Sequence, residues 1–490
     1  MPTDHPRTPP DGRADDPRTP DGRPDDQRDA RPDSRSDGRG DPRTGFDRRR
    51  FLTLAGGASA LGLLAACTPD RPRASDASST SVGRAPTTSA PGPPSPSASS
   101  TPATTSSSTT TTGAASAAPG SPAGRVLVIV QLSGGNDGLN TLVPVDGRYH
   151  DNRPTLGLPD TDLLAVPGTT AYGLHPSLAP FKSLLAAGQV AALEAIGYAH
   201  PNRSHFAALD DWWSATPGQS STTGWLGRWL DATAGTDDDP LRAVALASGV
   251  PALTGTRVRP TIVASPQAFA FRPPRGADAH LLEQLTNVAP GEDPLAAAYR
   301  ASIGRAASAV RTFATLPAGA PGAEAAPSDD PTAGEITRSL ATAAQLVAGH
   351  APTRIVHVTA GGFDTHAGQL ETHKMLLGDL ALGIRTFFEQ VTAAGQADRV
   401  LLMTVSEFGR RVHENGSGGT DHGKAGVQFV VGPSVNGGVF GRADLAQLDD
   451  GDLAPDIDVR SLYAMALDWL GGPTDEVLGR RYDTLGVVRR

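Results

Sequence analysis

The chain has 490 residues, 52 acidic and 43 Lys or Arg side chains, and a formal net charge of −9. Residues 1–50 are neutral overall and residues 51–124 have a net charge of +1, so residues 125–490 carry a net charge of −10. This acidic region has no clustered basic stripe, which excludes nucleic acid as an evident partner. The single cysteine, Cys67, excludes an intramolecular disulfide and a metal site built from cysteines.

The first residues look like an unstructured extension followed by an export signal. Residues 1–47 are rich in Arg, Asp and Pro and hold almost no large apolar side chains, so we expect them to be disordered. Residues 48–67 begin with Arg48 and Arg49 and continue as a short apolar run that ends at Cys67. A charged start before an apolar run too short to span a bilayer is typical of an export signal, not of a transmembrane helix.

Residues 48–67 resemble two known bacterial targeting signals. Arg48 and Arg49 match the twin-arginine signal, which sends folded proteins to the twin-arginine translocase. Residues 64–67 resemble a lipobox, in which the chain is cut before Cys67 and the thiol is lipidated; the alternative is a leftover structural cysteine. Residues 68–124, rich in Ser, Thr, Pro and Ala, predict a flexible linker. We therefore expect an extracytoplasmic protein, anchored to the cell membrane as a lipoprotein or secreted.

Residues 125–490 alternate between strand and helix patterns. Apolar, β-branched runs predict strands buried on both faces at 125–132, 189–196, 241–247, 353–359, 399–405 and 427–431. Helical patterns lie at 203–215, 224–234, 294–316, 334–350, 370–394 and 460–470, and a Pro/Ala/Gly-rich stretch at 317–331 predicts a surface loop. This alternation predicts a single α/β domain whose mostly parallel sheet has helices on both faces.

Acidic and imidazole side chains recur where the predicted strands end. Ligands of open α/β sheets bind beyond the carboxyl ends of the strands, so these side chains are candidates for a site. They are, in chain order, Asp137, Asp364, His366, Glu407, Asp421 and His422. Each alone is commonly a turn, cap or ion-pair residue, but their recurrence at one edge predicts a divalent metal, Zn²⁺ or Mn²⁺ first and Ca²⁺ as a further option. Such an ion polarises an ester oxygen and activates a nucleophile.

Ser204 stands where the helix at 203–215 begins. It is either a plain helix cap or a nucleophile, because the positive field at a helix N-terminus favours a phosphate or sulfate group in transfer. Arg203 or Lys424 would neutralise the charge that develops on that group. His200 and His205 flank the serine, and we expect at least one of them to be structural.

Five motifs together resemble a known family. They are SGGNDG at 133–138, NRSHF at 202–206, GFDTH at 362–366, SEFGR at 406–410 and TDHG at 420–423. In this order they resemble the secreted bacterial family called domain of unknown function 1501 (DUF1501). That family is similar in order and topology to the alkaline phosphatase and sulfatase superfamily, which implies an alkaline-phosphatase-like fold.

The resemblance also implies roles for single residues. By position, Asp137 would be the first metal ligand and Ser204 the nucleophile. Asp364 and His366 would bind one metal, Glu407 the other, and His422 would be the last ligand.

The sequence departs from the superfamily pattern at two places. Asp364 and His366 are two positions apart, where the superfamily usually has four, and Phe408 stands where a His would follow the acid. Either Asp421 or another His substitutes, or the second metal is weak or missing. The metal count and the reaction remain open at this point.

The sequence thus predicts a lipid-anchored, metal-dependent hydrolase of phosphate or sulfate esters. Its substrate would be an anionic ester, either a small molecule or a cell-envelope polymer. The main alternative is a non-catalytic cell-envelope binding or assembly protein on the same fold. An ATP-binding loop at 133–138 is disfavoured because Gly138 replaces a hydroxyl residue and an exported domain has no ATP pool. An ordinary serine hydrolase is disfavoured because residues 125–490 lack a Gly-x-Ser-x-Gly motif.

Overall fold

The computed structural model describes residues 124–235, 239–247, 249–263, 286, 293–316 and 333–489. Arg48, Arg49, Cys67, the linker at 68–124 (apart from Gly124) and the loop at 317–331 lie outside the described residues. Among the helices of the described part, none combines the length and apolarity that crossing a membrane requires.

The strands are β1 (Val126–Leu132), β2 (Leu142–Pro144), β3 (Leu164–Ala165), β4 (Tyr172–Leu174), β5 (Val190–Gly197), β6 (Ala243–Leu246), β7 (Thr261–Ile262), β8 (Ile355–Ala360), β9 (Val400–Val405), β10 (Gly426–Val431), β11 (Gly438–Phe440), β12 (Leu448–Asp449), β13 (Asp452–Leu453) and β14 (Ile457–Asp458). The α-helices are α2 (Gly138–Thr141), α3 (Gly147–Asn152), α4 (Lys182–Ala186), α5 (His205–Ser214), α6 (Trp225–Thr233), α8 (Pro294–Thr315), α9 (Glu335–Ala348), α10 (Gln369–Ala393), α11 (Val459–Leu470) and α12 (Thr474–Leu478). The 3₁₀ turns are η2 (Asp160–Asp162), η3 (Pro176–Phe181), η4 (Pro251–Leu253) and η7 (Ala397–Arg399).

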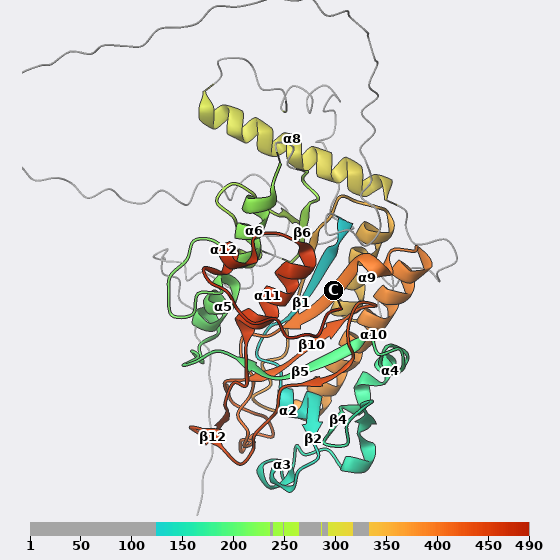
Figure 1. Cartoon of the computed structure of the whole chain (residues 1–490), viewed down its shortest axis with the longest axis vertical. Coiled ribbons are helices and arrows are strands. Elements are labelled where there is room, and N and C mark those ends of the chain that lie inside the picture. Colours follow the sequence, from blue (N-terminus) through green and yellow to red (C-terminus); the bar gives the residue numbers. More distant parts are fainter. Residues whose placement is uncertain are drawn as a thin grey trace, which may run out of the picture. The chain divides into compact units, whose positions relative to one another are not determined.

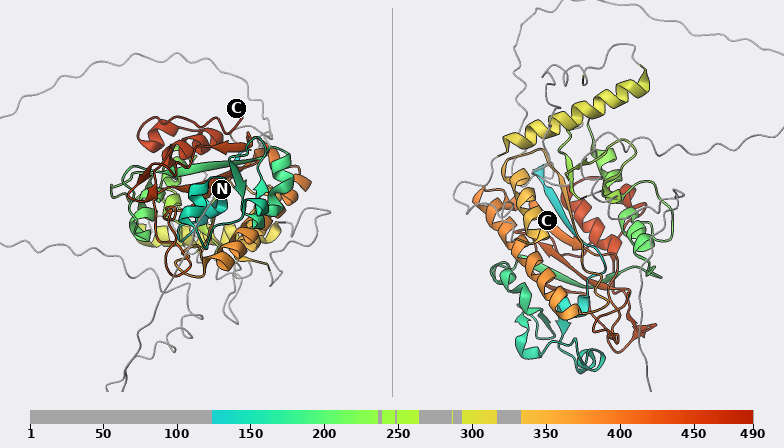
Figure 2. Two further views of the ribbon diagram at one scale, coloured as in Figure 1. Left: turned by 90° about the horizontal axis from the view of Figure 1, so that it is seen from below. Right: turned by 180° about the vertical axis from the view of Figure 1, so that it is seen from behind.

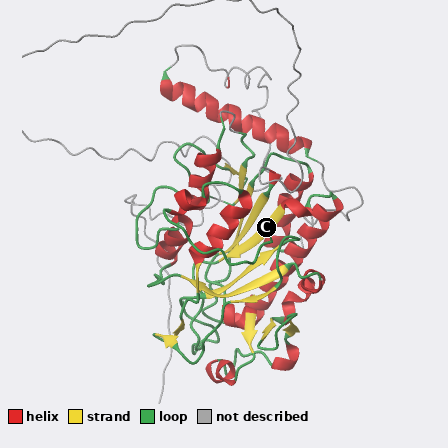
Figure 3. Cartoon of the chain, viewed as in Figure 1, coloured by secondary structure: helices red, strands yellow, loops and turns green. Residues whose placement is uncertain are grey.

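The main sheet, whose strands are yellow in Figure 3, has the strand order β11-β5-β10-β9-β1-β8-β6-β7, and β14 also pairs with β5. Strand β1 pairs in parallel with β8 and with β9, and β6 pairs in parallel with β7 and β8. Strand β10 is antiparallel to both of its neighbours, β5 and β9. The prediction of a mostly parallel sheet is confirmed, with β10 as its antiparallel member.

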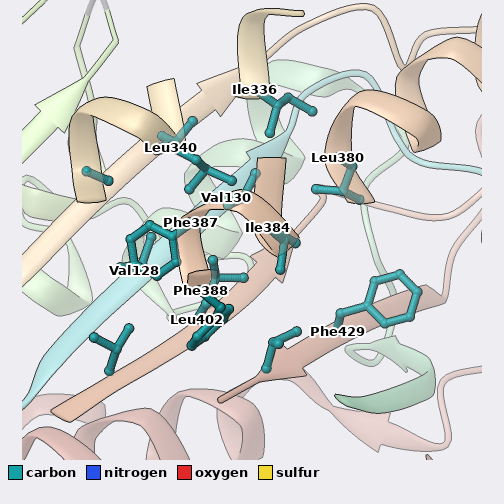
Figure 4. Packing of buried hydrophobic residues seen from close by; sticks show 14 of the residues in the cluster. Val128, Val130, Ile336, Leu340, Leu380, Ile384, Phe387, Phe388, Leu402 and Phe429 are labelled. Atoms are coloured by element: carbon teal, nitrogen blue, oxygen red, sulfur yellow. The ribbon is translucent and has the colours of Figure 1, made fainter. Parts of the chain in front are cut away.

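Strand β1 shows why the sheet carries helices on both faces. All seven of its side chains are buried, and successive side chains point to opposite faces because a strand has a period of two. Val128 and Val130 belong to the core under α9 and α10, which Figure 4 shows from close by. Leu127 and Ile129 belong to the core under α5, α6 and α11 on the other face. Figures 1 and 2 show helices on both sides of the sheet, as the sequence predicts.

Helices α9 and α10 are joined by a cap as well as by apolar packing. The N-cap residue of α9, Gly334, has no side chain that could accept from the first turn. The side chain of Asp379 on α10 takes the role of the cap and accepts hydrogen bonds from the backbone N–H groups of Ile336 at 2.9 Å and Thr337 at 3.2 Å. Satisfying these otherwise unpaired donors stabilises a helix end by about 1 kcal/mol.

The register of the central strands brings the predicted motifs to one edge. Leu132 at the end of β1 pairs with Ala360 at the end of β8, and Gln131 pairs with Val405 at the end of β9. Strand β5 ends at the same edge, because its Ile196 pairs with Gly426, the first residue of β10. The loops that carry the SGGNDG, NRSHF, GFDTH, SEFGR and TDHG motifs therefore start or end at this edge.

Candidate functional site

Three histidines surround one aspartate where these loops meet. Oδ1 of Asp364 lies 3.0 Å from Nε2 of His366 and 3.1 Å from Nε2 of His422. Oδ2 of Asp364 lies 3.5 Å from Nε2 of His205, the first residue of α5. The Nε2 atoms of His366 and His422 are themselves 2.9 Å apart. We call these four residues the imidazole–aspartate cluster.

The cluster is accessible and its aspartate is ionised. The side chain of Asp364 is 46% exposed, so solvent or a ligand can reach it. Burial alone would raise the pKa of Asp364, but the hydrogen bond from Arg410 and its positive charge lower that pKa below its usual range. The carboxylate is therefore negatively charged at any physiological pH.

The proton of each ring is held on the side that faces away from Asp364. Nδ1 of each histidine donates to an oxygen that accepts: His205 to Glu407 at 2.9 Å, His366 to Asp421 at 2.9 Å, and His422 to the carbonyl of Arg203 at 2.8 Å. In a neutral imidazole the other nitrogen then carries a lone pair. All three Nε2 lone pairs therefore lie on the side of the ring nearest Asp364.

This donor set fits a divalent cation. Lone pairs and a carboxylate this close together repel one another unless a proton or a cation lies between them. Metal-binding histidines commonly donate their other ring N–H to a carboxylate or a carbonyl, as all three rings do here. Nitrogen and oxygen donors without sulfur suit Zn²⁺ or Mn²⁺. Within the described ranges, the ligand atoms of His205, Asp364 and His422 all lie within 4.8 Å of one another, with His366 beside them.

Arg410 fixes the position of Asp364. Its guanidinium is fully buried and donates to Oδ1 of Asp364 at 2.7 Å and to the carbonyl of Phe363 at 2.9 Å. It also donates to the carbonyls of Gly134 and Gly135 in the loop after β1, and to the carbonyl of Thr420 at 2.7 Å. One cation thus ties three loops of the edge together and holds the carboxylate in place.

Glycine lets these loops approach one another. Gly134 has a φ of +120°, and a Cβ atom there would lie 2.3 Å from the backbone nitrogen of Asp364. Gly135 has a φ of +80°, and a Cβ atom there would meet the ring of Phe408 at 2.3 Å. Larger residues at these positions would push the loop after β1 away from the cluster.

Glu407 lies buried behind His205. Its Oε1 accepts from the backbone N–H of Gly134 at 2.8 Å as well as from His205. Its Oε2 has no hydrogen-bond partner among the described residues, and the residue lines a small cavity of about 20 Å³ that Trp212 and His357 also line. Glu407 is therefore placed to orient His205.

Phe408 forms an apolar wall of the cluster. Its buried ring lies 5.0 Å from the ring of His205 and 4.5 Å from the ring of His422, measured between centroids. The side chain that replaces the expected histidine thus packs against two imidazoles and limits their rotation.

Asp137 is buried in an ion pair. It accepts from Arg153 at 2.6 Å and 3.1 Å, one distance for each carboxylate oxygen, and from Nε2 of Gln369 at 2.5 Å. Burial would raise the pKa of Asp137, but the charge and hydrogen bonds of Arg153 lower it overall. Oε1 of Gln369 in turn accepts from Thr365 at 3.0 Å and Thr420 at 2.6 Å, which precede His366 by one residue and His422 by two. Asp137 therefore anchors these loops, instead of offering a free carboxylate as the sequence suggested.

Ser204 adjoins the cluster through both of its neighbours. It is the exposed N-cap residue of α5, yet its side chain makes no capping hydrogen bond. The carbonyl of Arg203, the residue before it, accepts the hydrogen bond from His422, and the residue after it is His205. Its backbone is held at the cluster while its hydroxyl is not used to cap the helix.

The two cations expected to bind an anion are already paired. Arg203 forms ion pairs with Asp450 at 3.1 Å and with the buried Asp452. Nζ of Lys424 lies 2.7 Å from Oδ2 of Asp449. All three carboxylate partners come from the hairpin formed by β12 and β13, whose strands are too short to be predicted from the sequence.

The structure brings together Asp364, His366 and His422 of the six predicted ligands. Asp421 and Glu407 lie behind the rings as acceptors. The fourth member, His205, and the supporting Arg410 had no assigned role in the sequence prediction; the signal for His205 was its place next to Ser204 at a helix start.

Comparisons with known proteins give one family match. The family model described as protein of unknown function (DUF1501) matches residues 192–481. This range includes the cluster, Ser204 and Arg410 but begins after Asp137. No curated protein matches the chain.

Similar solved structures share little sequence with the chain. Ps i-CgsB has 10% identity and a TM-score of 0.33, covering 73% of this chain and 75% of that one. A protein in the alkaline phosphatase superfamily from Vibrio parahaemolyticus has 10% identity and a TM-score of 0.32, covering 73% and 69%. The lipoteichoic acid synthase LtaP from Listeria monocytogenes has 9% identity and a TM-score of 0.33, covering 74% and 77%. At these TM-scores the likenesses do not inform the activity of this chain.

Proposed function

The chain belongs to the DUF1501 family of proteins of unknown function, and we propose that it is a metal-dependent hydrolase of phosphate or sulfate esters. The observation that carries the proposal is the imidazole–aspartate cluster. Three histidines keep their protons on Nδ1, on hydrogen bonds of 2.8–2.9 Å, and direct their Nε2 atoms toward one exposed carboxylate. A solvent-accessible set of nitrogen and oxygen donors is suited to a catalytic metal, which needs open positions for a substrate.

His205, Asp364, His366 and His422 would hold the cation. When bound, a divalent ion would supply Lewis-acid stabilisation of the transferring group and favour the deprotonated form of a nearby hydroxyl. Arg410 would keep Asp364 in place by donating to its Oδ1 at 2.7 Å. Zn²⁺ and Mn²⁺ suit these ligands best, and Ca²⁺ is the further option.

Ser204 would act as the nucleophile. Its Oγ would attack the phosphorus or sulfur of the ester, so that a new bond to Oγ forms while the bond to the leaving oxygen breaks. The hydroxyl proton ends on the leaving alcohol. Water would then cleave the serine ester, releasing phosphate or sulfate and restoring the hydroxyl. The first backbone N–H groups of α5, which begins at His205, would favour the anionic group.

The location we propose is extracytoplasmic. The sequence signals that support it are the twin-arginine pair Arg48 and Arg49 and the lipobox that ends at Cys67. The partners would be the twin-arginine translocase during export and the membrane through the lipid anchor afterwards. The substrate would be an anionic ester of the cell envelope or its surroundings, because the linker at 68–124 would hold the domain there.

The proposal is tested with the full chain, loaded with Zn²⁺ or Mn²⁺ and assayed on nitrophenyl esters of phosphate and sulfate. Ser204→Ala should lower turnover at least a hundredfold and keep its metal. Asp364→Ala should lose both the metal and the activity. Glu389→Gln, which breaks an exposed ion pair with Arg385 on α10, serves as the control and should change neither. Full turnover by Ser204→Ala would refute the nucleophile.

A non-catalytic binding protein remains the second candidate, and Phe408 is the observation that favours it. Its ring stands where the superfamily resemblance implies a ligand, so a second metal would lack that donor. Metal binding that Asp364→Ala abolishes, without hydrolysis of any ester, would favour this candidate over the hydrolase.

A further inference from the structure

The cations beside the proposed site are all neutralised by carboxylates of the chain itself. Besides the pairs of Arg203 and Lys424 described above, Nε of Arg411 lies 3.6 Å from Oδ1 of Asp452, and its Nη2 donates to the carbonyl of Asp450 at 2.6 Å. The three carboxylates belong to residues 448–453, which we call the acidic hairpin. Arg203 precedes the proposed nucleophile by one residue, and Lys424 follows His422 by two.

The acidic hairpin is held firmly over these cations. Asp452 is fully buried and pairs with Arg203 and Arg411. Asp450 and Gly451 form the turn with φ values of +56° and +75°, the left-handed conformation that a two-residue hairpin turn of this kind requires. Asp449 and Asp450 keep their side chains 60% and 75% exposed, so they contribute charge at the surface without being part of the core.

The remaining cation at the site is also committed. Arg410 is buried and donates to Asp364. The site therefore has four cations against six carboxylates, a surplus of two negative charges when its imidazoles are neutral. The cations are Arg203, Arg410, Arg411 and Lys424, and the carboxylates are Asp364, Glu407, Asp421, Asp449, Asp450 and Asp452.

This balance sets a limit on the charge of the substrate. One divalent ion at the cluster would bring the surplus to zero and, because all four cations of the site are already paired, would leave none of them for a second negative charge on the substrate. A phosphate monoester carries close to two negative charges at neutral pH, because its second pKa is about 6. Sulfate monoesters and phosphate diesters carry only one.

We infer that the substrate is a monoanionic ester, a sulfate monoester or a phosphate diester, and that Asp449 and Asp450 of the acidic hairpin determine this specificity. They act through Lys424 and Arg203, because the ion pairs that they form with these cations reduce the cations' attraction for the substrate. They are therefore positioning residues. The inference rests on the proposed hydrolase and adds the charge class of its substrate.

The test compares three substrates at pH 8 with the metal-loaded full chain. They are 4-nitrophenyl sulfate, bis-(4-nitrophenyl) phosphate and 4-nitrophenyl phosphate. The wild type should have a higher kcat/KM for at least one of the two monoanions than for the dianion, and the preferred one identifies the ester. The double variant Asp449→Asn/Asp450→Asn should raise kcat/KM for the dianion at least tenfold relative to the preferred monoanion, because Lys424 loses its carboxylate partner and Arg203 loses one of its two. Asp452 stays unchanged, so the buried part of the hairpin is retained.

The control removes two exposed carboxylates elsewhere. Glu389→Gln/Asp475→Asn lowers the net negative charge by the same amount, on α10 and α12, and should leave the ratio of the substrates unchanged. A wild type that prefers the dianion, or an unchanged ratio in the hairpin variant, would overturn the inference while the hydrolase stands.

A binding measurement separates this inference from the proposed activity. Calorimetry compares the monoanion benzenesulfonate with phenylphosphonate, a dianion at pH 8. The wild type should bind benzenesulfonate more tightly, and the hairpin variant should shift the ratio toward phenylphosphonate at least tenfold. If no ester is hydrolysed, the hydrolase proposal fails, and a charge preference that does not shift between the two proteins would overturn the specificity inference as well.

Discussion

Replacing Asp421 by alanine tests how the chain prepares a histidine for a metal. Oδ1 of Asp421 accepts from Nδ1 of His366 at 2.9 Å and from Asn415 at 3.1 Å, and the side chain is 55% exposed. Without this acceptor the ring of His366 can rotate, or carry its proton on Nε2, and then no longer directs a lone pair at Asp364. Loss of such a partner typically weakens metal binding tenfold to a hundredfold, or about 1.4–2.7 kcal/mol.

The geometry places Asp421→Ala near the lower end of that range. Solvent screens this exposed pair and can replace its acceptor, whereas the equivalent carboxylate behind His205, Glu407, is buried. We expect a dissociation constant for Zn²⁺ that rises about tenfold, measured by competition with a chromophoric chelator. Asp421→Asn retains an acceptor oxygen and should recover most of the affinity.

The control for this prediction is stability. Because Asp421 is exposed, urea unfolding of the metal-free Asp421→Ala protein should match the wild type closely. An unchanged Zn²⁺ affinity in Asp421→Ala would refute the acceptor role and, with it, the assignment of His366 as a ligand.

Other predictions concern the buried groups. Glu194 on β5 is buried, and burial raises its pKa to about 8. The free energy of unfolding of the wild type should therefore fall as the pH rises from 4.5 through 8, because the buried carboxyl must then lose its proton. Glu194→Gln should be more stable than the wild type by up to about 3 kcal/mol at pH 7 and by little at pH 4.5, as measured by urea unfolding. Gln369→Leu should lower the free energy of unfolding by about 2–3 kcal/mol, since it removes one hydrogen bond to the buried Asp137 and the shared acceptor of two threonine hydroxyls; a loss below 0.5 kcal/mol would contradict its bridging role. Burial lowers the pKa of His357 to about 3 and that of His373 to about 4, so the folded protein takes up these protons later than the unfolded chain; stability should fall as the pH drops from 6.5 toward 4, and a flat profile in calorimetric scans would argue against neutral buried rings.

The sequence predicts the central strands well because they are buried on both faces. All six predicted strands are present, and so are the six helices, since long periodic patterns carry the strongest local signal. The orientation of β10 could not be read in this way, because an apolar run is the same in either direction. Strands β11 to β14 have two or three residues each and are too short to show a period.

The residues of the candidate site could be predicted only where an acidic or imidazole side chain lies in a loop next to a strand. Asp364, His366 and His422 could be named as candidates because they lie in loops next to strands at the ligand-binding edge, and the structure brings these three together. The role of Asp137 as an ion-pair residue depends on its contact with Arg153. The pairing of Arg203 depends on Asp450 and Asp452, in a hairpin 247–249 positions away in sequence. Which carboxylate meets which cation is decided by the folded chain, so spacing alone could not separate a ligand from an ion pair.

The metal content of the protein tests the central claim most directly. The full chain is purified, stripped with a chelator, reloaded separately with Zn²⁺, Mn²⁺ and Ca²⁺, and analysed by elemental mass spectrometry beside Asp364→Ala and Glu389→Gln. We predict a bound divalent ion in the wild type and in Glu389→Gln, and none in Asp364→Ala. A wild type that retains none of the three ions, or an Asp364→Ala protein that binds them equally well, would contradict a metal site at the imidazole–aspartate cluster.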